Sequence, residues 1–134
     1  MCNILVPVDG SESSARAVRV AIRVHAKLAL KVHLLHVQIP LLPIGDESTN
    51  RRSAEVSGVE ALASAKALLA AAGVPYTSEV ASGYVGSTIV SYAKTHGCDA
   101  IVMGTRGLGS TEQLLGSIAR QVVHLADMPV TLVK

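Results

Sequence analysis

The sequence predicts an α/β domain built on one parallel β-sheet with helices on both of its faces. Short apolar runs alternate along the chain with segments of helical periodicity, in the order βαβαβαβαβ. No internal repeat or linker interrupts this alternation, and 134 residues are enough for one hydrophobic core. We therefore expect residues 1–134 to form a single domain.

The first half of the chain holds two predicted strands around one predicted helix. Ile4–Val8 is apolar and partly β-branched, which indicates a buried strand. The hydroxyls of Ser11–Ser14 can cap the start of a helix over 15–29, whose cations share one face: Arg16, Arg19, Arg23 and Lys27. Lys31–Val37 is a second apolar strand, and residues 39–52 are rich in proline and polar residues, which predicts a long loop.

The second half is expected to alternate helix and strand at 53–72, 76–81, 87–96, 99–103, 111–126 and 130–133. Polar Thr77, Ser78 and Glu79 indicate that the strand at 76–81 lies at an edge of the sheet. Ser110–Gln113 fits a capping box, and a helix that begins there would place Gly116 in its interior.

Composition excludes several classes of function. The chain has three tyrosines and no Phe or Trp, so it lacks the aromatic platforms that bind single-stranded nucleic acid. A net charge of +2 is too small to argue for a nucleic-acid partner, and no apolar run is long enough to cross a membrane. The first residues do not resemble a signal peptide, so we expect a cytoplasmic protein in which Cys2 and Cys98 are reduced and largely buried.

No set of side chains in the sequence predicts a metal site of its own or a nucleophilic enzyme. His33 and His36 are three apart on a predicted strand, so they point to opposite faces and cannot share one ion. The chain has no G-x-S-x-G motif, and Asp9 has no evident acid–base partner. We therefore expect no catalytic residues.

Two predicted strand ends carry residues suited to a phosphate-bearing ligand. Asp9 follows the first strand, and the glycine-rich run 104–111 follows the fourth. In an open parallel sheet, ligands bind at these carboxyl ends, and glycines let backbone N–H groups approach phosphate oxygens. The run is not a Walker A loop, because Ser110 occupies the position of the lysine, and its glycine spacing does not match G-x-G-x-x-G.

Three blocks of the sequence together resemble the universal stress protein family. They are Ile4–Ser11 (ILVPVDGS), Leu34–Val37 (LLHV) and the segment from Met103 through Gly116-Ser117 to Pro129-Val130. The resemblance spans the chain and implies an adenine nucleotide alpha hydrolase-like fold with strand order 3-2-1-4-5. It also implies a homodimer paired through the last strand, Val130–Val133.

The resemblance further implies that the protein binds ATP, with Mg²⁺ bound to the nucleotide, and acts as a nucleotide-dependent stress-response module. Asp9 would lie near the ribose, the phosphates and the metal, and backbone and side-chain donors would surround the rest. The nucleotide-binding residues implied are Pro7, Val8, Asp9, Val37, Met103, Gly104, Arg106, Gly107, Gly116, Ser117 and Ile118. No base is positioned for phosphoryl transfer, so efficient hydrolysis is not expected, although slow hydrolysis stays open.

One departure from the family pattern leaves alternatives open. Family members that bind ATP carry G-x2-G-x9-G-[S/T], whereas only eight residues separate Gly107 from Gly116 here. A dimeric interaction module of the same fold that has lost the nucleotide is therefore the main alternative. An enzyme acting on a small phosphorylated metabolite is a third, and it would need a second side chain converging on Asp9.

Overall fold

The computed structural model describes residues 2–39, 47–106 and 115–134, with residues 47–57 described as helical backbone only. In chain order the elements are β1 Cys2–Pro7, α1 Glu12–His25, β2 Leu30–Gln38, α2 Glu47–Ala71, β3 Tyr76–Ser82, α3 Val85–Thr95, β4 Ala100–Gly104, α4 Ser117–Leu125 and β5 Val130–Val133. All strand pairs are parallel, in the order β3-β2-β1-β4-β5, which confirms the predicted fold.

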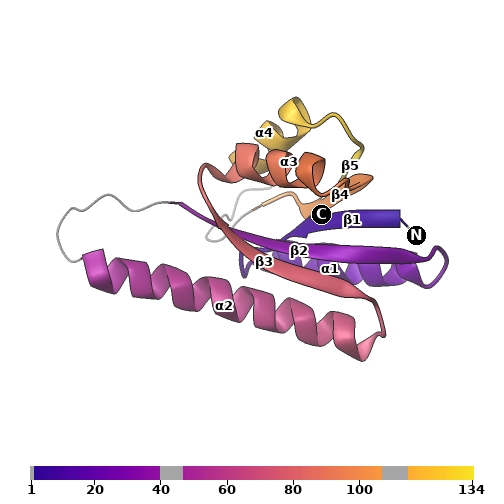
Figure 1. Cartoon of the computed structure of the whole chain (residues 1–134), viewed down its shortest axis with the longest axis horizontal. Coiled ribbons are helices and arrows are strands. Elements are labelled where there is room, and N and C mark those ends of the chain that lie inside the picture. Colours follow the sequence, from indigo (N-terminus) through magenta and orange to yellow (C-terminus); the bar gives the residue numbers. More distant parts are fainter. Residues whose placement is uncertain (1, 40–46, 107–114) are drawn as a thin grey trace.

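Two hydrophobic layers cover the two faces of the sheet. Ile4, Val6 and their neighbours on β2 pack against α1 and α2, whereas Leu5, Leu35 and Ile101 pack against α3 and α4. Figure 1 shows this arrangement, with the long helix α2 on one side of the sheet and α3 and α4 on the other. Successive side chains along each strand therefore point to opposite faces of the sheet and pack into two separate hydrophobic cores.

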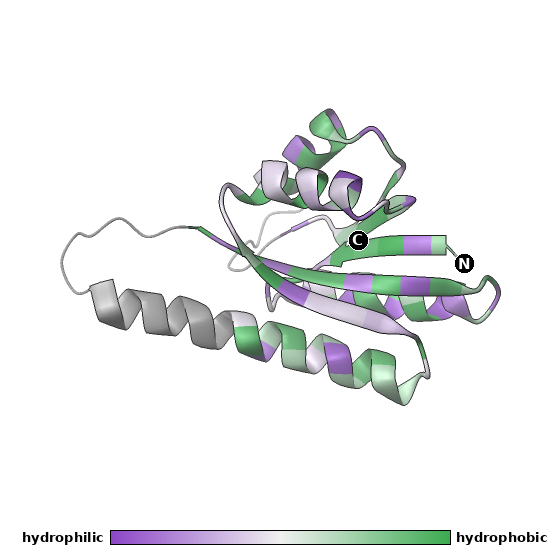
Figure 2. Cartoon of the chain, in the orientation of Figure 1, coloured by the Kyte–Doolittle hydropathy of each residue, from purple (hydrophilic) through white to green (hydrophobic). Residues whose placement is uncertain are grey.

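The position of each strand in the sheet follows its polarity. Ile4, Leu5 and Val6 of β1 are buried, as expected of a strand with neighbours on both sides. β3 alternates between half-buried and exposed residues and lies at one edge, as predicted from its polar side chains. Figure 2 shows the contrast, since β1 is mostly hydrophobic and the first part of β3 is pale or hydrophilic.

Two predicted boundaries are wrong. Helix α2 begins at Glu47, so residues 47–52 are helical, and of the predicted loop 39–52 the part 40–46 lies outside the described residues. Helix α4 begins at Ser117 with Gly116 as its N-cap, so Gly116 is not inside a helix. The predicted capping box at Ser110–Gln113 lies outside the described residues. A helix that starts at Ser117 places its first turn beside the end of β4, because Ser117 and Ile118 line the same pocket as Met103 and Gly104.

The histidines and cysteines lie as follows. His33 belongs to the face covered by α3, where its ring lies 6.5 Å from that of His96, and His36 faces α2, as predicted from their spacing. Both thiols are free, but only Cys98 is buried, whereas Cys2 is half-buried on the opposite face of the sheet. In the described ranges, no three histidine, cysteine or acidic residues gather as metal ligands, and no helix is long and apolar enough to span a membrane.

Candidate functional site

A pocket of about 440 Å³ opens at the carboxyl ends of β1 and β4, a size typical of small-molecule sites. Loops after the strands, the C-terminal half of β2 and the starts of α3 and α4 enclose it. The lining residues are Pro7, Val8, Asp9, Ser14, Leu35, Val37, Val85, Ile89, Met103, Gly104, Thr105, Arg106, Leu115, Gly116, Ser117, Ile118 and Ala119.

Ten of the eleven residues predicted for nucleotide binding line this one pocket. Gly107 is the exception, because it lies outside the described residues. The pocket also contains residues that the sequence did not single out. Val85 and Ile89 come from α3, and no local pattern in the sequence places that helix beside the pocket; the crossover of the chain between β3 and β4 does so.

The turn between β1 and α1 fixes Asp9 at the pocket. The Ser11 N–H donates to Asp9 Oδ1 at 2.9 Å, and the Asp9 N–H donates to Ser14 Oγ at 3.4 Å. Gly10 has a φ of 86°, a left-handed conformation that favours glycine, so the chain can turn sharply after the carboxylate. The sequence Asp9-Gly10-Ser11 thus builds a tight turn that holds the Asp9 side chain at its own helix start.

Behind this turn, His36 supports the end of β1. Because a carbonyl can only accept, Nδ1–H of His36 donates to the Val8 carbonyl oxygen at 2.8 Å. The ring is buried, and a Cβ at Gly58 of α2 would lie only 2.6 Å from its Cδ2. The absence of a side chain at Gly58 therefore lets α2 close over His36, which in turn holds Val8 in the pocket wall.

On the other side of the pocket, hydrogen bonds fix the segment that follows β4. The Thr105 N–H donates to the Val133 carbonyl at 3.2 Å, and the Gly116 N–H donates to the Thr105 carbonyl at 2.7 Å. The second bond joins the two ends of the glycine-rich segment. Gly116 and Ser117 therefore line the same pocket as Gly104, although the spacing is one residue shorter than in the family pattern.

The pocket has an apolar end and a polar end. Val37, Val85 and Ile89 supply aliphatic surface, whereas Gly116 and Ser117 bring the first turn of α4, whose start no side chain caps. An uncapped helix start presents backbone N–H groups and the positive end of the helix dipole, which favours an anion. Among the described lining residues, one acid, Asp9, and one base, Arg106, carry the formal charge.

Fold and site together define a class of protein, a doubly wound parallel α/β domain with an anion-compatible ligand pocket at the carboxyl ends of its central strands. The model of the universal stress protein family matches residues 1–134. A universal stress protein of Thermus aquaticus is 36% identical over 138 residues, covering 98% of this chain and 97% of the relative. One of Methanocaldococcus jannaschii is 33% identical over 137 residues, covering 98% of this chain and 81% of the relative. The chain belongs to the universal stress protein family.

Solved structures agree on the fold. The universal stress protein UspA of Lactobacillus plantarum superposes with a TM-score of 0.86 at 23% identity, covering 99% of this chain and 97% of that one. A universal stress protein of Archaeoglobus fulgidus, solved in complex with dAMP, has a TM-score of 0.76 at 24% identity. The match covers 100% of this chain and 98% of that one. A universal stress protein solved in complex with cAMP has a TM-score of 0.78 at 24% identity. The match covers 99% of this chain and 97% of that one. The adenine nucleotide alpha hydrolase-like fold predicted from the resemblance is thereby confirmed.

Proposed function

We propose that this protein binds an adenine nucleotide in the pocket at the ends of β1 and β4. The observation that carries the proposal is the gathering of ten predicted residues, from segments far apart in the chain, around one pocket with an apolar and a polar end. Relatives of the same fold solved with dAMP and with cAMP support the choice of adenine nucleotides.

Each part of the nucleotide has a counterpart in the pocket. The base would lie against the aliphatic side chains of Val37, Val85 and Ile89, with the backbone of Pro7-Val8 at its edge. The ribose would rest over Met103-Gly104. The phosphates would meet the start of α4 at Gly116, Ser117 and Ile118, and the guanidinium of Arg106. Gly107 keeps its predicted role as a backbone donor, outside the described residues.

For ATP, we propose that Mg²⁺ accompanies the nucleotide. Among the described lining residues, the charges of Asp9 and Arg106 cancel, so these residues supply no net positive charge to offset the negative charge of a triphosphate. Mg²⁺ prefers oxygen ligands and is commonly held by one carboxylate together with phosphate oxygens, and the Asp9 carboxylate fits that role. The described part of the chain offers no cluster of three ligands, so the metal would depend on the nucleotide.

The proposed role is that of a nucleotide-dependent stress-response module rather than an enzyme. Asp9 is the one acid among the described lining residues, and as a ligand of Mg²⁺ it would leave no second carboxylate or histidine among them to activate a water molecule. We place this role in the cytoplasm, where the two free thiols stay reduced.

We also propose a homodimer formed through β5. This strand ends the sheet, so one side of its backbone has no neighbouring strand in the described chain, a situation that proteins commonly resolve by pairing. Native mass spectrometry should give the mass of two 13.9 kDa copies. A mass of one copy at micromolar concentration would contradict the dimer.

The test of nucleotide binding is titration calorimetry of the full chain with AMP and with ATP, each with and without Mg²⁺. We expect ATP to bind more tightly with Mg²⁺ and Asp9→Asn to abolish that gain. Asp99→Asn is the matched control, because Asp99 also accepts a backbone N–H (from Asn3, 2.8 Å) but at the opposite end of the sheet. If no adenine nucleotide binds at millimolar concentration, the alternative of a nucleotide-free interaction module replaces this proposal.

A further inference from the structure

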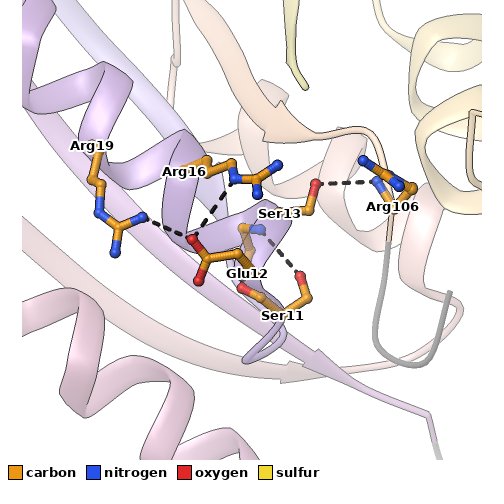
Figure 3. A network of polar contacts seen from close by, with 7 residues as sticks. Ser11, Glu12, Ser13, Arg16, Arg19 and Arg106 are labelled. Carbon is orange, nitrogen blue, oxygen red and sulfur yellow. Dashed lines mark hydrogen bonds and ion pairs between the residues drawn. The ribbon is translucent and has the colours of Figure 1, made fainter. Parts of the chain in front are cut away.

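Three buried serines form the N-cap and first turn of α1, and they have different partners. Ser11 caps the helix, since its Oγ accepts the Ser14 N–H at 3.1 Å, and Ser14 Oγ donates back to the Ser11 carbonyl at 3.0 Å. Ser13 reaches outside the turn: its Oγ accepts the N–H of Arg106 at 3.2 Å, across 93 positions of sequence. Figure 3 shows Ser13 pointing toward Arg106, away from the ion pairs that Glu12 makes with Arg16 and Arg19.

The contact between Ser13 and Arg106 depends on how closely α1 approaches the end of β4. A Cβ at Gly104 would lie 2.2 Å from Ser13 Oγ and 2.6 Å and 2.7 Å from the Ser13 carbonyl carbon and oxygen. Two of these three atoms belong to the backbone of the helix. The start of α1 therefore rests directly on Gly104, and this brings the Ser13 hydroxyl within reach of the next peptide groups.

Ser13 holds a residue of the pocket without lining the pocket itself. Arg106 and Ser14 are among the lining residues and Ser13 is not. Two hydrogen bonds of this segment, at Thr105, join backbone groups, whereas the bond to the Arg106 N–H uses the side chain of Ser13. The turn at Ser11–Ser14 thus connects the two halves of the pocket: it holds Asp9 after β1 and Arg106 after β4.

We propose that Ser13 is a positioning residue for the phosphate-binding half of the pocket, acting through the Arg106 peptide. The inference rests on the proposed nucleotide function. Because Arg106 lies with Gly116 and Ser117 at the polar end, losing the Ser13 hydroxyl should affect the phosphate contacts. The aliphatic end, which Val37 and Ile89 supply on the face of the sheet opposite α1, should hold the nucleoside as before.

The experiment compares the affinities of Ser13→Ala and the unchanged chain for adenosine, AMP and Mg²⁺-ATP. One hydrogen bond lost at the phosphate end should weaken AMP and ATP by roughly three- to tenfold. Adenosine affinity should change less than about twofold, which is within the usual scatter for a site that is not contacted. Ser87→Ala is the matched control: its Oγ bonds the Tyr84 carbonyl at 3.3 Å at the start of α3, outside the pocket.

The outcomes separate this inference from the proposal on which it rests. If the unchanged chain binds neither adenosine nor AMP, the nucleotide function itself fails. If the chain binds both and Ser13→Ala weakens adenosine as much as AMP, or weakens neither, the positioning role is refuted while the nucleotide function stands. Should Ser13→Ala fail to fold, hydrogen exchange of the unchanged chain decides, because the Arg106 amide must exchange more slowly than open amides; fast exchange overturns the inference.

Discussion

A single methyl group added at Gly104 tests whether the start of α1 really rests on the end of β4. Where space allows, Gly→Ala stabilises a protein by about 0.4–1 kcal/mol, because the unfolded chain loses freedom. At position 104 the new Cβ would lie 2.6 Å and 2.7 Å from backbone atoms of Ser13, well inside contact distance. Helix α1 must therefore move away, and Gly104→Ala should destabilise the fold.

The size of the effect follows from two contributions. Overpacking against well-ordered neighbours typically costs about 1–3 kcal/mol. Displacing α1 also lengthens the bond from Arg106 N–H to Ser13 Oγ, which contributes about 0.5–1.5 kcal/mol. After the gain of about 0.4–1 kcal/mol from Gly→Ala is subtracted, we expect a net loss of ~1–4 kcal/mol, which for a domain of this size lowers the melting temperature by roughly 3–15 °C.

Urea unfolding followed by far-UV circular dichroism measures this loss, and Gly86→Ala provides the comparison. At Gly86 the three atoms nearest to the new Cβ all belong to the side chain of Gln121, including its Cβ at 2.8 Å, so removing that side chain with Gln121→Gly should relieve the clash. Truncating Ser13 to glycine should not rescue Gly104→Ala, because it removes the Ser13 Oγ but leaves the two obstructing backbone atoms in place. A Gly104→Ala protein as stable as the unchanged chain, or more stable, would refute the close approach.

Three further predictions concern buried groups. Burial lowers the pKa of His33 below its ordinary 6.5, and the charge of Lys31 lowers it further. The His33 contribution to stability should therefore be complete above pH 6.5 and fall as the pH drops toward the lowered pKa. Urea midpoints that do not change between pH 7.5 and 5.5 would contradict this. Gly58→Ala should destabilise the fold by about 1 kcal/mol, because the Cβ displaces His36 from Val8 at a cost that exceeds the gain in helix propensity; a higher melting temperature would show that the ring moves freely. Burial raises the pKa of the Cys98 thiol, so it should react with a thiol reagent only on unfolding, and two free thiols should then be counted by mass.

The sequence was sufficient for the sheet because its strands carry strong local signals. β1 and β4 are apolar over nearly their whole length, and the polar side chains of β3 correctly placed it at an edge. The start of α2 was missed for a local reason. Residues 47–52 read ESTNRR, a polar stretch without apolar periodicity just after two prolines, and such a composition is also typical of loops.

Several site residues were beyond local patterns. Ser11 and Ser14 could be expected at a helix start, but the bond from Ser13 to Arg106 joins residues that only the finished fold brings together. The same holds for Val85 and Ile89, whose presence in the pocket depends on α3 crossing over the correct face of the sheet. The sequence could predict that the residues after β1 and β4 lie close together, because parallel strands bring their carboxyl ends to the same edge of the sheet.

The short spacing between Gly107 and Gly116 need not separate the two ends of the site. The entropy of closing a loop grows as (3/2)RT ln n, so a change from nine residues to eight alters it by only about 0.1 kcal/mol. Against this, the hydrogen bond from the Gly116 N–H to the Thr105 carbonyl, at 2.7 Å, contributes on the order of 1 kcal/mol. The hydrogen bond between Gly116 and Thr105, rather than the number of residues between the glycines, therefore sets where Gly116 and Ser117 lie. A spacing rule that counts residues alone would reject a pocket whose walls are fixed by bonds outside the counted segment.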